Sequence, residues 1–184
     1  MVKQIALGAA VVVGGVLALV ALRPGEYRIV RSARMAAPPA AVFPHVNDLQ
    51  KFNVWNPWMK LDPGVHTAYS GPPAGLGASM AWAGNQNIGE GRMTVSESRP
   101  DELVRFHMEF IAPFASTAIA ELELTPEGGG TVVTWSMAGH NTFVGKAMGL
   151  VMNMDRMIGG QFEQGLASLK SIAESTASAG ETRR

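Results

Sequence analysis

The chain has 184 residues, enough for one ordinary domain with a sizeable core. Its 15 Lys and Arg balance its 15 Asp and Glu, so it lacks the basic surplus with which a general nucleic-acid binder neutralises phosphates. Charged residues make up 16% and hydrophobic residues 47%, which argues against intrinsic disorder. The absence of cysteine excludes disulfides, thiol catalysis and zinc–thiolate sites. His45, His66, His107 and His140 show no metal-ligand spacing, so neither a metal nor another cofactor is expected.

An apolar run opens the chain. Ile5–Leu22 is 18 residues long and contains no charged or hydrogen-bonding side chain. As a helix it would extend roughly 27 Å, about the hydrocarbon thickness of a bilayer. The run therefore predicts a single-pass transmembrane anchor over residues 1–24. A cleavable signal peptide is one alternative, although the run is long and residues 19–23 make a poor cleavage site. A buried core helix is the other, although the run shows no polar face.

The charges that flank this run indicate an orientation. Lys3 and the amino terminus precede it, whereas four arginines follow it closely: Arg23, Arg28, Arg31 and Arg34. Because basic flanks remain on the cytoplasmic side, their number favours a cytoplasmic position for the rest of the chain. The opposite orientation stays open, because very short N-terminal tails often remain on the cytoplasmic side themselves.

The elements after the anchor alternate strand-like runs with turn signals. Residues 25–35 are expected to form a strand, after which Pro38-Pro39 opens a short helix through Val46. Asn47-Asp48 then caps a second short helix. Short turn-forming spacers separate the following runs, which favours antiparallel pairing. These further strands are expected at residues 65–70, 77–84, 88–98, 102–112, 115–125 and 131–139.

The last element is a predicted long helix with one apolar face. The residues of this face recur every three or four positions: Phe143, Ala147, Leu150, Met154, Ile158, Phe162, Leu166, Leu169 and Ala173. Gly159-Gly160 and Gly165 interrupt it, indicating either close packing against the sheet or a kink that opens a pocket. Residues 176–184 are small and polar and are expected to form a disordered tail.

From about Tyr27 to Glu174, the order of several short motifs resembles the SRPBCC superfamily of START-related, helix-grip domains, and within it the polyketide cyclase/dehydrase-like branch. The resemblance implies an α+β fold over residues 25–175, in which a curved antiparallel sheet of about seven strands wraps the C-terminal helix around a cavity. It implies no single activity. The motifs that carry it are Ala37-Pro38-Pro39, Val42-Phe43, Trp55-Asn56-Pro57-Trp58, Asp62-Pro63, Tyr69-Ser70-Gly71, Gly75-Leu76-Gly77-Ala78, Gly89-Glu90-Gly91, Thr131–Trp135 and Phe162–Lys170.

Strand alternation and helical spacing assign the side chains that would line such a cavity. The chain has 11 methionines, whose flexible thioethers adapt to irregular apolar guests. The alternative is that the same residues simply fill the core. The predicted ligand-binding residues are Met80, Trp82, Met93, Phe106, Met108, Phe110, Trp135, Met137, Met154, Ile158 and Phe162, with Met148, Met152 or Met157 beside them.

Trp55 and Trp58 lie three residues apart around Pro57. They are candidates for the rim or lid of the cavity, because indole is apolar in its body and polar at its N–H. The alternative is a structural plug that fixes this loop to the sheet, which the rigid prolines favour.

Catalytic candidates are few. His107 and Glu109 share one face of a strand, but this is the face opposite Phe106, so an exposed polar surface with an Arg105–Glu109 ion pair is the favoured interpretation. His140 ends the last strand near the expected mouth of the cavity and is the best polar candidate.

Three functions follow from these patterns. The favoured one is a membrane-anchored protein that binds a small hydrophobic or lipid-like ligand, for which no acid–base pair is needed. The second is a cyclase- or dehydrase-like enzyme, which the family resemblance alone supports. The third is an envelope interaction protein whose own side chains fill the cavity.

Overall fold

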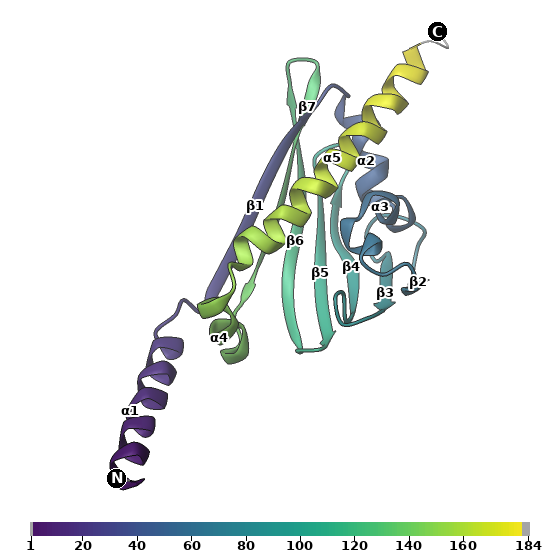
Figure 1. Ribbon diagram of the computed structural model, residues 1–184. Coiled ribbons are helices and arrows are strands. Elements are labelled where there is room, and N and C mark those ends of the chain that lie inside the picture. The colour runs from purple at the N-terminus through teal and green to yellow at the C-terminus, as the bar shows by residue number, and fades with distance from the viewer. Residues whose placement is uncertain (1, 182–184) are drawn as a thin grey trace.

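The computed structural model describes residues 2–181, and for residues 2–3, 5–7, 9–13, 151 and 179–181 it describes the backbone alone. The chain forms an antiparallel sheet with helices on one face (Figure 1). The elements are α1 (Val2–Ala21), β1 (Glu26–Met35), α2 (Pro39–Asn47), α3 (Leu49–Trp55), the 3₁₀ helix η1 (Pro57–Lys60), β2 (His66–Ser70), β3 (Ser79–Ala83), β4 (Glu90–Arg99), β5 (Leu103–Ala112), β6 (Ser116–Glu127), β7 (Gly130–His140), α4 (Phe143–Val151) and α5 (Met154–Glu181).

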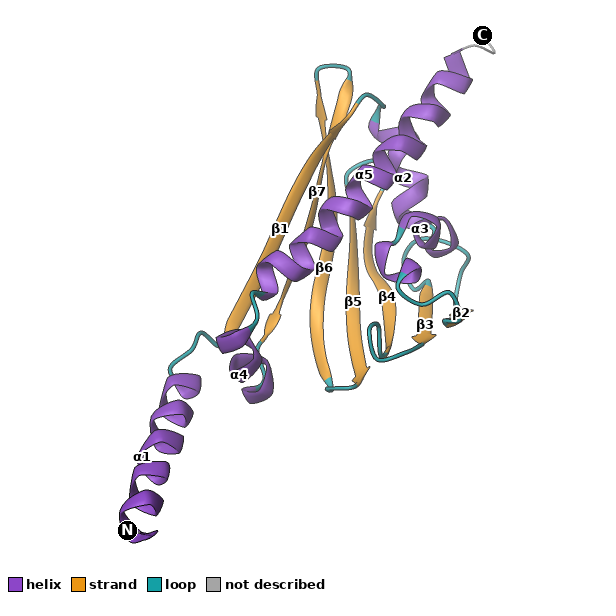
Figure 2. Cartoon of the chain, viewed as in Figure 1, coloured by secondary structure: helices purple, strands orange, loops and turns teal. Residues whose placement is uncertain are grey.

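The sheet has seven strands in the order β1-β7-β6-β5-β4-β3-β2, and every neighbouring pair is antiparallel. α5 crosses one face of this sheet, and α2 and α3 flank it (Figure 2). We call the face that carries α5 the inner face and the opposite one the outer face. This arrangement confirms the predicted α+β helix-grip fold, including the two short helices after the first strand. Each predicted strand lies within a few residues of an observed one.

The short helices begin where the sequence provides caps. Pro39 occupies the first turn of α2, where no backbone donor is needed. The carboxylate of Asp48 accepts hydrogen bonds from the backbone N–H groups of Gln50 and Lys51, which caps α3 as predicted. Together α2 and α3 place the apolar side chains of Val46 and Phe52 in the core.

The predicted long C-terminal helix is in fact two helices, and this part of the prediction is wrong. Met152 has an extended backbone, with φ −125° and ψ 136°, and separates α4 from α5. The side chain of Asn153 accepts a hydrogen bond from the backbone N–H of Arg156 at 2.9 Å. Asparagine is a strong N-terminal cap, so this bond starts a new helix within an apolar pattern that runs through the break.

α5 continues to Glu181, so residues 176–181 of the predicted disordered tail are helical, and residues 182–184 lie outside the described part of the chain. Ala177 packs against the core, which extends the helix beyond the predicted end of the domain at residue 175. The boundaries of the three predicted segments otherwise stay a prediction.

α5 packs closely on the sheet at two of its glycines. An added Cβ at Gly165 would lie 2.7 Å from Cζ3 of Trp135 and 3.1 Å from Cδ of Pro57. At Gly159 the added atom would collide with the guanidinium group of Arg31, whereas at Gly160 it would meet nothing within 4 Å. Close packing is therefore the role of Gly159 and Gly165, and α5 is unbroken through both.

α1 precedes the sheet and contacts α4. Among the helices of the described residues, none combines the length and the apolarity needed to cross a membrane. The predicted anchor over Ile5–Leu22 includes residues 5–7 and 9–13, whose side chains lie outside the described part of the chain, and it stays a prediction.

Candidate functional site

A pocket of about 930 Å³ lies where α4 and the first turns of α5 meet the inner face of the sheet. The sheet contributes Ile29, Phe110 and Met137, and Met148, Met154 and Ile158 come from the two helices. Met152 and Met157 also line it, so the pocket includes each of the three methionines offered as alternatives beside the cavity. Flexible apolar side chains therefore surround most of this space.

Polar and charged residues from several elements also line the pocket. They include Arg23 from the segment after α1, Glu26 and Arg28 of β1, Gln86 and Asn87 of the β3–β4 connection, His140 and Asn141 at the end of β7, Lys146 from α4 and Asp155 from α5. The side chain of His140 is 85% exposed, and its Nε2 lies 3.4 Å from a carboxylate oxygen of Glu26. The pocket thus combines a mainly apolar lining with several polar groups, the usual construction of a small-molecule site.

The other end of the inner face is closed by aromatic packing. Trp135 is buried and stacks on Phe162, with their ring centroids 4.2 Å apart and their planes at 8°. Phe52, Trp55 and Trp58 each present a ring edge to Trp135, at centroid distances of 5.2–6.0 Å. No comparable aromatic cluster is found among the described residues near Met154 and Ile158. The pocket therefore occupies only the end of the inner face beside α4.

Four of the predicted ligand-binding residues line the pocket: Phe110, Met137, Met154 and Ile158. Five others, Met80, Met93, Phe106, Trp135 and Phe162, are at most 3% exposed and belong to the packed core. Trp82 also belongs to the core, where its indole N–H donates to the carbonyl of Ile88, and Met108 is half-buried against that core. The alternation of side chains along the strands identified the inner face correctly. Most of the predicted residues on that face pack against other protein side chains and do not line the pocket.

Trp55 and Trp58 do not line the pocket. Trp55 is fully buried, and its indole N–H donates to the carbonyl of His45 at 2.9 Å. Trp58 contacts Trp135 and Phe162 through ring edges. These contacts fix the loop to the sheet, in agreement with the structural-plug interpretation.

Arg31 connects the sheet to the start of α5. Its guanidinium group lies 2.9 Å from Oδ2 of Asp155 and 2.7 Å from Oε1 of Glu163. The hydrogen bonds that Arg31 donates to Asp155 and Glu163 raise the pKa of Arg31, and the bond to Asp155 lowers the pKa of the Asp155 carboxyl. Arg31 thus holds the helix that forms one wall of the pocket. The sequence pattern did not single out Arg31, although Arg31 shares the inner face of β1 with Tyr27 and Ile29.

Tyr27 is the second inner-face residue that the sequence analysis missed. Its side chain lines the pocket and lies against Gly139, where an added Cβ would be 2.9 Å from the phenolic oxygen. Burial raises the pKa of the Tyr27 phenol, so it remains a protonated donor at neutral pH. The phenolic O–H of Tyr27 can donate a hydrogen bond to a carbonyl or carboxylate oxygen of a ligand.

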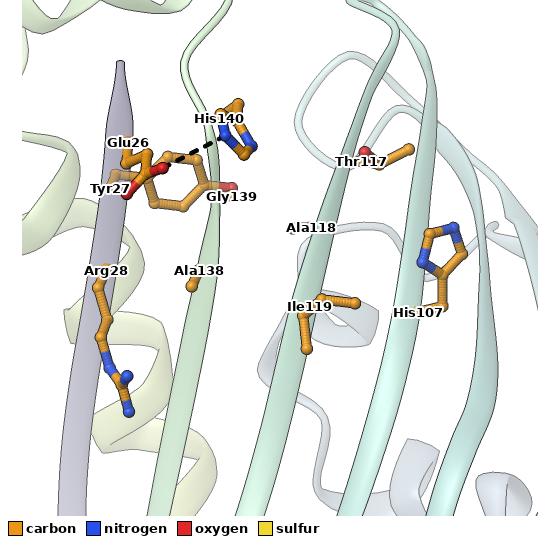
Figure 3. Close-up of a pocket in the computed structure, with 10 residues that line it drawn as sticks. All are labelled: Glu26, Tyr27, Arg28, His107, Thr117, Ala118, Ile119, Ala138, Gly139 and His140. Atoms are coloured by element: carbon orange, nitrogen blue, oxygen red, sulfur yellow. Dashed lines mark ion pairs between the residues drawn. The ribbon is translucent and has the colours of Figure 1, made fainter. Parts of the chain in front are cut away.

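His107 lies on the outer face, as does Arg28, and both line a second depression of about 550 Å³ that His140 borders (Figure 3). Glu109 is exposed on the same outer face, so His107 and Glu109 do not reach the inner pocket. The expected Arg105–Glu109 ion pair is wrong. Arg105 pairs with Glu97 and Glu121, which face it across the neighbouring strands, whereas residues four apart on one strand are separated by roughly 13 Å.

Within the described part of the chain, no three His, Asp or Glu side chains are grouped so that they would hold a metal ion.

Comparison with protein families gives one match that spans most of the chain. Residues 27–174 match the family described as "Polyketide cyclase / dehydrase and lipid transport". A search of curated proteins finds no match.

Solved structures share the fold at low sequence identity. Protein CV1439 from Chromobacterium violaceum is 18% identical over 83% of this chain and 99% of its own, with a TM-score of 0.57. Ara h 8.0201 is 13% identical over 84% of this chain and 99% of its own, with a TM-score of 0.54. The di-domain ARO/CYC protein StfQ of the steffimycin biosynthetic pathway is 11% identical over 84% of this chain and 52% of its own, with a TM-score of 0.60. These likenesses establish the fold and leave the activity open.

Proposed function

The chain belongs to the polyketide cyclase/dehydrase and lipid transport family, and we propose that it is a membrane-anchored protein that binds a small hydrophobic or lipid-like molecule in the pocket beside α4. The observation that carries this proposal is the apolar, methionine-lined space of about 930 Å³ between the sheet and the start of α5. Its size lies within the range of roughly 300–1,000 Å³ that is typical of small-molecule sites.

The chemistry of the lining supports an amphipathic ligand. Met137, Met148 and Met154 would contact an apolar chain, and thioethers adapt to chains of irregular shape. Arg23 and Lys146 in the lining would attract an anionic head group. Burial of a hydrocarbon chain contributes about 0.8 kcal/mol per methylene group, so even a medium-length chain provides strong binding energy.

The membrane anchor is the second part of the proposal. It is supported by the 18-residue apolar run of Ile5–Leu22 and by the arginines that follow it, which favour a cytoplasmic domain. An anchor would keep the pocket close to the bilayer, where apolar ligands concentrate. Fractionation of lysed cells tests the anchor, and protease digestion of intact cells tests the orientation. A soluble mature chain that begins after Leu22 would contradict it.

Native mass spectrometry of the detergent-extracted full chain, followed by organic extraction, tests ligand binding. We expect an apolar molecule to co-purify and to be lost in Phe110→Ser, because this change places a hydroxyl in the pocket wall. Phe43→Ser is the matched control, since Phe43 is also a half-buried phenylalanine packed against the core but does not line the pocket. Repeated recovery of empty protein that also fails to bind a fluorescent fatty acid would contradict the proposal.

A cyclase- or dehydrase-like reaction is the second candidate. The observation that favours it is Tyr27, whose protonated phenol lies in the pocket and can donate to a carbonyl oxygen of a substrate. If the protein is such an enzyme, Tyr27→Phe removes turnover of a polyketide-like substrate while ligand retention stays unchanged. If it acts only by binding, no turnover is found in the parent chain. The third function, an interaction protein with a filled cavity, is not supported by a pocket of this size.

A further inference from the structure

The end of the domain beside α1 exposes large apolar side chains. We define the α4 face as Phe114 of the β5–β6 connection and Phe143, Val144 and Leu150 of α4, each of which is 38–55% exposed. Phe114 and Leu150 line the same pocket, so the two parts of the face are neighbours. Exposed apolar groups that gather at one end of a domain indicate a contact surface.

The opposite end of the sheet is charged. It is formed by the β4–β5 and β6–β7 hairpins (Figure 1), which carry Arg99, Asp101, Glu102 and Glu127. None of the large hydrophobic side chains that are exposed in the described part of the chain lies in these two hairpins.

The segment that leaves α1 is fastened to the α4 face. The backbone N–H of Asn141 donates to the carbonyl of Gly25 at 2.8 Å, and its side-chain amide donates to the carbonyl of Pro24 at 3.4 Å. The next residue, Thr142, caps α4 by accepting from the backbone N–H of Gly145 at 3.1 Å. The exit from α1 and the start of α4 are thus held together by two consecutive residues.

We propose that the α4 face rests on the surface of a lipid bilayer and that the pocket exchanges its ligand with that surface. This inference rests on the membrane anchor proposed above. Residues 22–25 separate α1 from β1 and extend at most about 15 Å, so an anchor that ends near Leu22 holds the domain within that distance of the hydrocarbon. The face then reaches the headgroup layer, where aromatic side chains such as Phe114 and Phe143 insert.

Charge supports a bilayer as the occupant of this face. Arg23 and Lys146 lie beside the apolar residues and also line the pocket, so they are placed to meet anionic headgroups.

Site-specific fluorescence quenching tests the proposal on the full chain, because the chain contains no cysteine and a single introduced one labels one site. Phe143→Cys and Phe114→Cys place an environment-sensitive fluorophore on the α4 face. Leu76→Cys is the control, since Leu76 is 67% exposed in the β2–β3 connection, at the sheet edge opposite β1. Each labelled protein is reconstituted into phosphatidylcholine–phosphatidylglycerol vesicles that contain spin-labelled lipid.

We expect the labels at 143 and 114 to lose most of their fluorescence to the spin-labelled lipid, and the label at 76 to keep its own. If spin-labelled lipid quenches both α4-face labels no more than the label at 76 while the protein remains in the vesicle fraction, the result supports the anchor and contradicts docking of the α4 face on the bilayer. If the protein leaves the vesicles altogether, the anchor itself fails. A label at 143 that is shielded from aqueous iodide and also from spin-labelled lipid would show a protein occupant, such as a second copy, and would overturn the proposal.

Discussion

Two alanine substitutions in α5 separate close packing from helix propensity. Gly160→Ala adds a methyl group that meets nothing within 4 Å. Gly165→Ala adds one that would lie 2.7 Å from Cζ3 of Trp135, 3.1 Å from Cδ of Pro57 and 3.4 Å from Cζ3 of Trp55. Both positions lie inside the same helix, so the gain in intrinsic helix propensity is the same for the two variants.

The magnitudes follow from this difference. Replacing a glycine by alanine inside a helix stabilises the fold by roughly 0.5–1 kcal/mol. Gly160→Ala should show this gain. At Gly165 the gain is offset by overpacking, which costs typically about 1–3 kcal/mol when neighbours cannot retreat. Trp135 cannot retreat, because it stacks on Phe162 and has Trp55 against its edge. Gly165→Ala should therefore be less stable than Gly160→Ala by about 1–3 kcal/mol.

Urea denaturation of the full chain in mild detergent, followed by tryptophan fluorescence, measures both free energies of unfolding. The buried tryptophans around Gly165 report on the region that changes. Equal stabilisation by the two substitutions would refute the reasoning, because it would mean that α5 does not press against Trp135.

Two other predictions concern Arg31 of β1 and His45 of α2. Arg31→Gln removes the ion pairs that hold the start of α5, so amide hydrogen exchange should become faster over residues 154–163. Arg34→Gln is the control, because it removes only the exposed ion pair with Glu127, whose atoms are 3.6 Å apart, and it should leave exchange in that segment unchanged. Equal exchange rates in the two variants would contradict the role of Arg31. Burial lowers the pKa of His45 below its usual 6.5, so the unfolded chain binds this proton more readily, and stability should fall as the pH drops below about 6.5. In His45→Gln this part of the pH dependence should vanish from denaturation curves, and an unchanged slope would assign it to other groups.

The strands and their faces could be predicted because they depend on local pattern. Val104, Phe106 and Met108 alternate with Arg105 and His107, and a strand has no other way to place them than on two faces. Turn residues such as those before β3 and after β6 then marked the ends of the strands. The antiparallel order followed from the short spacers.

The position of the pocket could not be predicted in this way. Trp135 and Met137 alternate on one strand, yet Trp135 is packed among aromatic rings from α3, η1 and α5, and Met137 lines open space. The difference depends on which distant helix covers each residue. The same is true of Arg105, whose partners Glu97 and Glu121 face it only through the strand register. The break at Asn153 was hidden because the apolar period continues across it.

The most direct test of the proposed pocket is photolabelling of the full chain with a diazirine fatty acid, followed by mass-spectrometric mapping of the adducts. The proposal predicts adducts within the segments that line the pocket, which are residues 23–29, 86–89, 110–116 and 137–158. An excess of unlabelled fatty acid should remove them. Adducts that are confined to other segments, or that unlabelled fatty acid does not displace, would contradict a ligand site beside α4.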